Sequence, residues 1–420
     1  MSGARREPAG PRGRGGPGRA STEASWSPEC ASATGSWGPG RPAEHDAVVV
    51  GAGPSGLATA AVLARHGIAA VILDAGSTPG ARWRERYPAL RLNTVRALSG
   101  MPGRRIPRRC GRYPSLGDYV AYLDDYARRK RLDVRVRTAV SRIDAAPDGR
   151  WALQTSGGPL LTLAVIVATG YNAVAVMPDW PGRETFRGTL LHAEQYRSPE
   201  PYLGREVLVV GAGVSGIDIA GLLVRAGVSV SLSMRTAPNI LPRQWLGLPL
   251  QPGGIVSERL PAALGDVSGF ALQRMIWGDL TAYGIPRAPE GVETAHRRTL
   301  RFAAVDDGFV AALKAGRTRV IAPIARLEAQ TALLSDASRV RADAVICATG
   351  YRPGLEPLVG HLGVLDGRGL PLHCRDPQHA PVAGLHFVGF WPSNGGHLRA
   401  CAAQARRVGA AVARALGARR

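Results

Sequence analysis

The sequence has 420 residues, enough for two or three domains, which argues against a lone binding module. Hydrophobic residues make up 45% and charged residues 20%, as in globular proteins, so wholesale disorder and fibrous repeats are excluded. The net charge of +21 comes almost entirely from arginines scattered along the chain. Because binding to nucleic acid requires basic residues gathered on one face, no nucleic-acid surface is predicted.

Residues 1–45 are rich in Gly, Pro, Arg, Ser and Ala without apolar periodicity, which predicts a disordered tail or a start codon set too early. Residues 47–64 carry no charge, yet the glycines in their middle predict a strand, turn and helix rather than a membrane span. The five cysteines form no CxxC pair and no zinc-ligand spacing. This pattern favours a cytoplasmic protein without a metal and excludes flavin-linked disulfide reductases.

A unit of strand, glycine turn, helix and strand occurs twice. Residues 48–50 enter GAGPSG, a helix follows, and the next strand ends at Asp74. Residues 207–210 enter GAGVSG, again followed by a helix and the strand VSVSLSM. A strand that leads through GxGxxG into a helix is typical of dinucleotide binding. The chain is therefore predicted to contain two nucleotide-binding folds.

In the first turn, Gly51 permits a tight bend, Gly53 lets the backbone approach a pyrophosphate, and Gly56 allows close helix packing. The phosphates would lie at the helix N-terminus, beside Ser55. Asp74, 23 residues after Gly51, is placed to accept a hydrogen bond from a ribose hydroxyl. These features predict an FAD or NAD site.

The corresponding residues of the second turn are Gly211, Gly213, Ser215 and Gly216. The position equivalent to Asp74 is Met234, and Arg235 follows it. A strand end that lacks a carboxylate and carries an arginine suits the 2′-phosphate of NADPH, and Ser233 would add a hydroxyl donor. The alternative is that Arg235 is simply a solvated strand end.

Between the two turns, Phe186, Gly188, His192 and Tyr196 match the fingerprint FxGxxxHxxxY. In this respect the sequence resembles the flavin-containing monooxygenases, and the final Tyr distinguishes it from the related Baeyer–Villiger enzymes, which have Trp there. The resemblance implies that His192 and Tyr196 belong to the cofactor-binding region. Considered alone, the two side chains would be linker residues with ordinary hydrogen bonds.

The resemblance extends from about residue 46 to the C-terminus. The segment RWRERYPALRLNT at 82–94 is similar to the one that crosses the isoalloxazine ring in bacterial members of the family. By that similarity Asn93 lies near the reactive face of the flavin and is the candidate catalytic residue. Trp83 and Arg84 would belong to a loop that covers the cofactor. The alternatives are a core aromatic residue for Trp83 and a turn residue for Asn93.

The implied fold is α/β, with two Rossmann-like dinucleotide-binding domains and the NADPH domain inserted into the FAD domain. Expected boundaries are 46–175 for the first part of the FAD domain, 176–317 for the NADPH domain and 318–420 for the second part. Thr349 and Gly350 match the second Ala-Thr-Gly element of the family, which leads the chain back from the NADPH domain. Residues 236–300 are expected to form irregular cover over the substrate site.

The resemblance implies a reaction of the EC 1.14.13 type. NADPH reduces FAD, and a C4a-hydroperoxyflavin formed with O₂ inserts one oxygen atom into a small soft nucleophile: an amine, a sulfide or a carbonyl compound. A homodimer is compatible with the sequence. One alternative is a flavin reductase or oxidase, which would be distinguished by the NADPH electrons released as H₂O₂. The other is a non-catalytic nucleotide-binding module, which would not consume NADPH.

Overall fold

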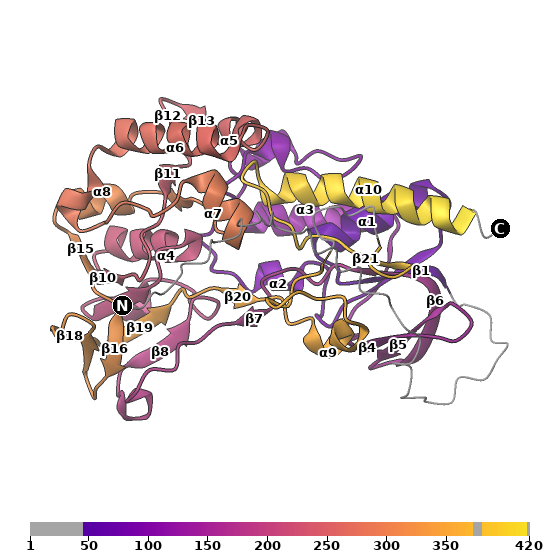
Figure 1. The fold of residues 1–420 in the computed structure, drawn as a ribbon, viewed down its shortest axis with the longest axis horizontal. Coiled ribbons are helices and arrows are strands. Elements are labelled where there is room, and N and C mark those ends of the chain that lie inside the picture. Colours follow the sequence, from indigo (N-terminus) through magenta and orange to yellow (C-terminus); the bar gives the residue numbers. More distant parts are fainter. Residues whose placement is uncertain (1–44, 373–379, 418–420) are drawn as a thin grey trace, which may run out of the picture. The chain divides into compact units, whose positions relative to one another are not determined.

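The computed structural model describes residues 45–372 and 380–417 (Figure 1). The tail predicted for residues 1–45 therefore lies, except for His45, outside the described residues. Two β-sheets organise the described part, and the chain enters the first, passes to the second and returns to the first. This arrangement confirms the expected α/β fold with one dinucleotide-binding domain inserted into the other.

The first sheet has a parallel half and an antiparallel half. In spatial order its strands are β3 (Asp133–Arg135), β2 (Ala70–Leu73), β1 (His45–Val50), β6 (Gly158–Val167), β5 (Trp151–Thr155) and β4 (Val140–Ala145), with β21 (Leu385–Phe387) parallel to β6. The first glycine turn and its helix lead from β1 to β2, which pairs parallel with β1. Strands β5 and β4 fold back from β6 as an antiparallel meander.

Helices α1 (Pro54–Arg65), α3 (Leu116–Arg129) and α10 (His397–Gly417) contribute to one hydrophobic core with the first sheet. The apolar and alanine-rich faces of α1 and α10 pack closely, and a Cβ at Gly409 would reach Val62 at 2.5 Å. Helix α3 begins with a capping box, because the Ser115 hydroxyl accepts from the Asp118 N–H at 3.1 Å and the Asp118 carboxylate accepts from the Ser115 N–H at 3.3 Å. The site is thus supported by a well-packed scaffold.

The second sheet is parallel throughout. Its strands, in spatial order, are β15 (Thr318–Ile321), β10 (Ser229–Ser233), β9 (Glu206–Val210), β19 (Ala344–Cys347) and β8 (Thr189–His192). Helices α4 (Val214–Arg225) and α8 (Phe309–Lys314) pack in its core. Between β15 and β19 the chain forms the antiparallel meander β16 (Ile324–Leu327), β17 (Thr331–Leu334) and β18 (Arg339–Arg341).

The expected boundary at residue 318 is wrong. β15 pairs with β10 and β19 pairs with β9, so residues 318–347 belong to the second sheet. The apolar run at 344–347 predicts a buried strand, but an apolar pattern does not specify which of two sheets the strand joins. The chain returns only after β19, where β20 (Tyr351–Arg352) pairs antiparallel with the outgoing β7 (Val174–Ala175).

The region 236–300 is more regular than expected. It contains α5 (Gln251–Ser257), α6 (Ala262–Trp277), α7 (Val292–Thr299) and the antiparallel pair β12 (Gln244–Trp245) with β13 (Leu248–Pro249). It also contains β11 (Ile240–Pro242), which pairs with β14 (Ala304–Asp306) just beyond the region. Its glycines allow close approach rather than breaking helices: a Cβ at Gly254 would lie 2.8 Å from the Asn394 carbonyl oxygen.

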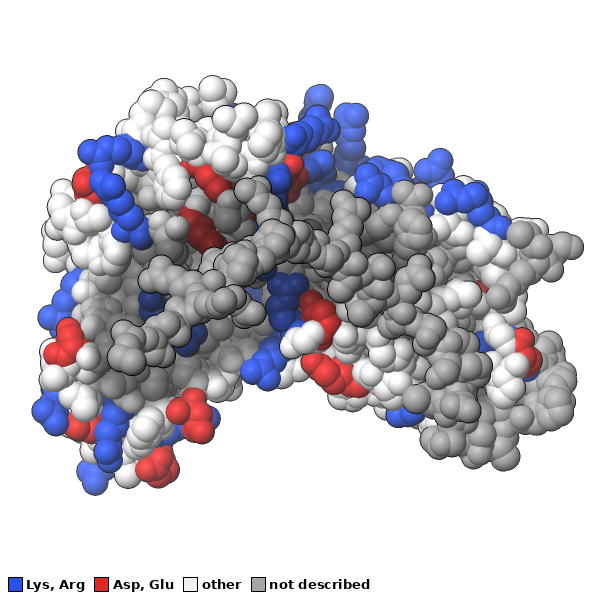
Figure 2. All heavy atoms as spheres, in the orientation of Figure 1, with Lys and Arg blue, Asp and Glu red and all other residues white. Residues whose placement is uncertain are grey.

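The remaining helices are short: α2 (Ala81–Arg84), α9 (Glu356–Val359) and the 3₁₀ turns η2 (Arg96–Leu98), η3 (Arg108–Cys110), η4 (Arg183–Thr185), η5 (Glu200–Tyr202), η6 (Leu280–Tyr283) and η7 (Gly360–Leu362). In Figure 2 basic and acidic side chains alternate around the lower margin of the face in view, while the surface over α6, β12 and β13 is mostly uncharged. Of the helices in 45–372 and 380–417, none combines the length and apolar character needed to cross a bilayer.

Candidate cofactor and substrate site

One cavity of about 1450 Å³ extends along the first glycine turn, reaches Val214 and Ser215 of the second, and continues under α5–α7. It is lined by the first turn, the segment 80–94, residues 168–173, the start of α4, the three helices α5–α7 and residues 389–401. A site for one drug-sized ligand occupies roughly 300–1,000 Å³. The larger volume here leaves room for a cofactor and a substrate together.

The first glycine turn contains two glycines that the fold requires and one that it does not. Gly51 has φ +106°, and a Cβ there would lie 2.7 Å from the carbonyl oxygen of Ala168. A Cβ at Gly56 would collide with the Gly51 carbonyl. Around Gly53, in contrast, nothing lies within 4 Å of a Cβ, and the residue lines the cavity. Gly53 therefore faces space that suits an approaching phosphate.

The second turn repeats this geometry. Gly211 has φ +102° and packs against the Ala348 carbonyl, Gly216 packs against Gly211, and Gly213 faces open space. Gly53 and Gly213 also share an extended backbone, with φ −75° and −76°. Each Ala-Thr-Gly element thus lies directly behind its own glycine turn.

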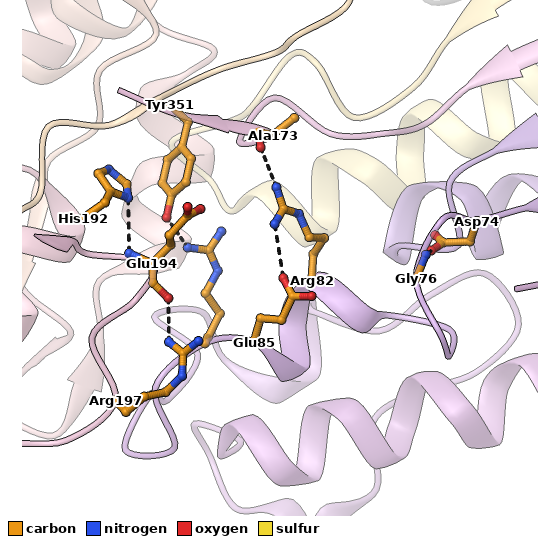
Figure 3. Close-up of polar contacts among 10 residues, drawn as sticks. Asp74, Gly76, Arg82, Glu85, Ala173, His192, Glu194, Arg197 and Tyr351 are labelled. Carbon is orange, nitrogen blue, oxygen red and sulfur yellow. Dashed lines mark hydrogen bonds and ion pairs between the residues drawn. The ribbon is translucent and has the colours of Figure 1, made fainter. Parts of the chain in front are cut away.

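The ends of the adjacent strands distinguish the two turns. The Asp74 carboxylate accepts the N–H of Ala52 at 2.5 Å. It also accepts the N–H of Gly76 at 2.7 Å (Figure 3). Asp74 also lines the cavity, and a carboxylate with about four acceptor positions retains capacity for a ribose hydroxyl.

At the second strand end, Met234 is buried and Arg235 is exposed, and within the described ranges Arg235 has no hydrogen bond or ion pair. Its guanidinium is therefore available to an anionic ligand. Ser233 does not fulfil its predicted role, because it is buried and its hydroxyl donates to the Ala322 carbonyl at 3.1 Å. Ser215 lines the cavity at the start of α4, and Ser55 does so at the start of α1.

The segment 82–94 contributes side chains other than those expected. Arg84 forms an ion pair with Asp124 on α3 at 2.5 Å and does not line the cavity, and its place in a loop over the cofactor stays a prediction. Arg82 and Arg86 line the cavity instead. Helix α2 ends at Arg84 and Arg86 lies beyond it, so helical periodicity could not have separated these two arginines from Arg84.

Hydrogen bonds hold both arginines in place, and Figure 3 shows those of Arg82. Arg82 donates to the Ala173 carbonyl at 2.5 Å and to Glu85 at 3.2 Å, and Arg86 donates to the Tyr351 hydroxyl at 2.5 Å. The bonds to Ala173 and Tyr351 join the segment 82–94 to the two strands that connect the domains. Ala173 immediately precedes β7, and Tyr351 belongs to β20. Trp83 lines the cavity and packs edge-on against Tyr119, with ring centroids 4.7 Å apart.

Asn93 lines the cavity and contacts Arg243, a residue that the sequence analysis missed. Arg243 donates from Nη2 to Asn93 Oδ1 over 3.4 Å. Its guanidinium pairs with Asp307 at 3.3 Å and lies over the Tyr113 ring, 5.3 Å from the centroid. The Arg243 side chain is only 11% exposed, so these contacts fix its position.

The residues of the FxGxxxHxxxY fingerprint lie behind the cavity rather than in it. Buried His192 accepts the Glu194 N–H at Nδ1 (Figure 3) and donates from Nε2 to the Gly350 carbonyl at 3.1 Å. Burial lowers the pKa of His192, which keeps this neutral tautomer. Tyr196 is buried and packs edge-on against Tyr87. Neither residue lines the cavity, so both support it from behind, and their predicted place in the cofactor-binding region stays a prediction.

The second Ala-Thr-Gly element is likewise a support. The Thr349 hydroxyl donates to the Val176 carbonyl, and the Gly350 carbonyl accepts the Val176 N–H at 3.0 Å. These bonds hold the two connecting strands together outside the cavity, and the cofactor role of Thr349 and Gly350 stays a prediction. The equivalent residues of the first element, Thr169 and Gly170, do line the cavity. Because the sequence motif is the same in both elements, it could not indicate which of the two lines the cavity.

A buried acid on α4 ties the segment 82–94 to the second domain. The Tyr87 hydroxyl donates to the carboxylate of Asp218, which lines the cavity. Burial raises the pKa of Asp218, and burial together with the neighbouring Asp218 raises that of Tyr87. At the start of α10, His397 Nε2 lies 3.4 Å from Cys401 Sγ, and both line the cavity.

Two glycine turns, each following a parallel strand of its own sheet and both contributing residues to one cavity, are typical of an oxidoreductase with two dinucleotide sites. Residues 48–246 match the family described as pyridine nucleotide-disulphide oxidoreductase. The indole-3-pyruvate monooxygenase YUCCA1 of Oryza sativa subsp. japonica is 34% identical over 360 residues, covering 84% of this chain and 87% of the relative. The probable indole-3-pyruvate monooxygenase YUCCA7 of Arabidopsis thaliana is 32% identical over 362 residues, covering 82% of each.

Among solved structures, the flavin-containing monooxygenase from Stenotrophomonas maltophilia aligns with a TM-score of 0.68 at 26% identity, covering 90% of this chain and 99% of that one. The chain belongs to the flavin-containing monooxygenase family, which depends on FAD and NADPH. It is thus a flavin monooxygenase that inserts oxygen with NADPH and O₂, and the oxidase and non-catalytic alternatives are not favoured. The open space at Gly53 and Gly213 fits the pyrophosphates of these two cofactors.

Proposed function

We propose that this monooxygenase acts on an aromatic 2-oxo acid of the indole-3-pyruvate type, in a reaction of the EC 1.14.13 class. The names of the relatives supply the substrate class. The observation that supports this proposal is the position of Asn93 and Arg243 in a cavity whose α6–α7 side is apolar. That side includes Leu272, Met275 and Phe302, which suit an aromatic ring.

The cavity also has cationic groups that suit the carboxylate of a 2-oxo acid. Arg82, Arg86, Arg91 and Arg243 line it. A guanidinium presents five N–H donors, so each of these arginines keeps free donors after the bonds described above. A planar carboxylate is matched by such a fork in a way that a thioether or a tertiary amine is not. This favours the oxo acid over the sulfide and amine classes.

The residues that would hold the cofactors follow from the geometry. The turn Gly51–Gly56 and the N-terminus of α1 would bind the FAD pyrophosphate, and Asp74 a ribose hydroxyl. The turn Gly211–Gly216 would bind NADPH, with Arg235 at its 2′-phosphate. When bound, FAD supplies the redox chemistry that accepts a hydride and activates O₂.

The chain's own part in the chemistry is to orient donors and to exclude water. Arg243 binds the amide oxygen of Asn93, so the Asn93 Nδ2 hydrogens are the ones presented to the reacting groups. Helices α5–α7 cover the substrate side of the cavity, which limits solvent access and strengthens each hydrogen bond inside it.

A turnover experiment with indole-3-pyruvate and ¹⁸O₂ tests this function. We expect one ¹⁸O atom in the product for each NADPH consumed, with the second oxygen atom in water and little H₂O₂. Trimethylamine and dimethyl sulfide, as representatives of the other two substrate classes, should stimulate NADPH oxidation less. Stoichiometric H₂O₂ with every substrate would contradict the proposal.

A cytoplasmic location and a homodimeric state are further parts of the proposal. The location is supported by the free thiols of Cys110, Cys347 and Cys401, all buried and none in a disulfide among the described residues. Light scattering of the purified protein tests the dimer, and fractionation of cells that express it tests the location.

A further inference from the structure

Glu293, in the first turn of α7, is a buried carboxylate that the functions described so far do not use. It is 1% exposed and lines the cavity. Within residues 45–372 and 380–417 its carboxylate has no hydrogen bond and no ion pair. Removing a carboxyl group from water without a hydrogen-bond partner is unfavourable, so such groups are normally paired.

Glu293 does not serve as a helix cap. Asp266 on α6 performs that task, because its Oδ1 accepts the N–H of Glu293 at 2.8 Å and that of Thr294 at 3.1 Å. The hydroxyl of Thr294 donates to the other oxygen of Asp266. The orphan N–H groups at the start of α7 are therefore satisfied without the Glu293 side chain.

The packing around Glu293 makes room for it. A Cβ at Gly265 would lie 2.5 Å from the Glu293 Cγ and 2.7 Å from the Ser257 Oγ. The glycine at this position of α6 therefore leaves space for the Glu293 side chain. The neighbouring cations have other partners. Arg298 pairs with Glu290 at 2.7 Å, and Arg297 donates to the Leu260 carbonyl at 2.8 Å.

We propose that Glu293 accepts a hydrogen bond from an N–H group of the substrate, which on the proposed function is the indole N–H of an aromatic 2-oxo acid. An indole is apolar except at this one donor. Glu293 offers a carboxylate acceptor to this cavity, which Leu272, Met275 and Phe302 also line. Glu293 is then a specificity residue, selecting N–H-bearing rings over rings that lack the donor.

Equilibrium binding to the oxidised holoenzyme, measured by calorimetry without NADPH, tests this inference. The ligands are indole-3-pyruvate and its benzofuran analogue, in which a ring oxygen replaces the N–H. A hydrogen bond to a charged group corresponds to about a tenfold to hundredfold difference in Kd, and we expect wild-type protein to prefer the indole by that factor. Glu293→Leu should abolish the preference, and Glu293→Gln, which retains an acceptor, should keep part of it.

Glu290→Gln is the matched control, because Glu290 lies three residues away and outside the cavity lining. It should leave the preference unchanged. The ligand-free protein provides a second measurement: Glu293→Leu should raise the unfolding temperature, because it removes an unpaired buried charge, whereas loss of a structural contact would lower it.

Equal binding of the two ligands by wild-type protein would overturn the inference, as would a preference that persists in Glu293→Leu. Tighter binding of tryptamine than of indole-3-pyruvate, abolished by Glu293→Gln, would also overturn it, because the partner would then be an ammonium group. These outcomes leave the proposed function intact, since turnover of indole-3-pyruvate is measured separately. If the indole preference holds but no oxygenated product forms, the proposed function fails and the binding role of Glu293 stands.

Discussion

Arg243 and Asn93, 150 residues apart in the sequence, share a hydrogen bond at the wall of the cavity. Arginine has only donors, so the atom of Asn93 that faces it must be the amide oxygen. The amide hydrogens of Asn93 consequently face another direction, toward the cavity that both residues line. Asp307 and Tyr113 hold Arg243 in place, so the orientation of the Asn93 donor is set before any ligand arrives.

The first prediction concerns this donor. In Asn93→Ala we expect NADPH-driven flavin reduction to continue at nearly the wild-type rate, because hydride transfer does not involve the amide. The ratio of oxygenated product to H₂O₂ should fall by about tenfold to hundredfold, the equivalent of one hydrogen bond to a charged group. Parallel assays of NADPH, H₂O₂ and product measure it.

Arg243→Met should lower the same ratio by a smaller factor, since Asn93 remains but is free to rotate. Gln330→Ala, an exposed amide outside the cavity, is the control and should behave as wild type. An unchanged product ratio in Asn93→Ala would remove Asn93 from the oxygenation step.

The second prediction separates the two glycine turns. Gly53 and Gly213 have the same extended backbone, and a Cβ at either meets nothing in the protein. Gly53→Val and Gly213→Val should therefore both fold, but each should block the phosphate of its own cofactor. We expect Gly53→Val to be purified colourless and Gly213→Val to be yellow with a strongly raised KM for NADPH.

Absorbance at 450 nm and steady-state kinetics provide the readouts, and circular dichroism checks the fold. A yellow Gly53→Val protein together with a colourless Gly213→Val protein would mean that the two cofactor sites are exchanged.

Residues whose role depends on backbone sterics were the easiest to predict. Gly51 and Gly56 have no substitute in their turn, and the motif therefore locates them without any structure. The fingerprint, in contrast, located His192 and Tyr196 but not the direction of their side chains, which face the protein interior. Arg243 and Glu293 belong to no sequence motif. Their importance arises from contacts across α6, α7 and the segment 82–94, which only the folded chain brings together.

The third prediction concerns cofactor choice. Arg235 is exposed and without a partner among the described residues, so it is free to bind a 2′-phosphate. Arg235→Ala should raise the KM for NADPH about tenfold to hundredfold and leave the KM for NADH nearly unchanged. Arg317→Ala, another exposed arginine of the same domain, is the control. Equal losses with both nucleotides would indicate that Arg235 supports the fold instead.

The last prediction uses the buried imidazole of His386 on β21. It is 5% exposed, and burial lowers its pKa from 6.5 to about 4. Below pH 6.5 the unfolded chain binds a proton that the folded chain refuses, so stability is lost as the pH falls from 6.5 toward 4. At pH 5 this loss is about 2 kcal/mol for the one group.

Urea unfolding followed by tryptophan fluorescence at pH 7 and pH 5 measures this loss. His386→Leu should reduce the destabilisation between the two pH values by about 2 kcal/mol, because leucine has no proton to gain. His397, whose pKa burial also lowers to about 4, should retain a similar dependence in the variant. His66→Leu, at an exposed position after α1, should leave the difference unchanged. The same acid sensitivity in His386→Leu and in wild type would show that the ring of His386 is already hydrated in the folded protein.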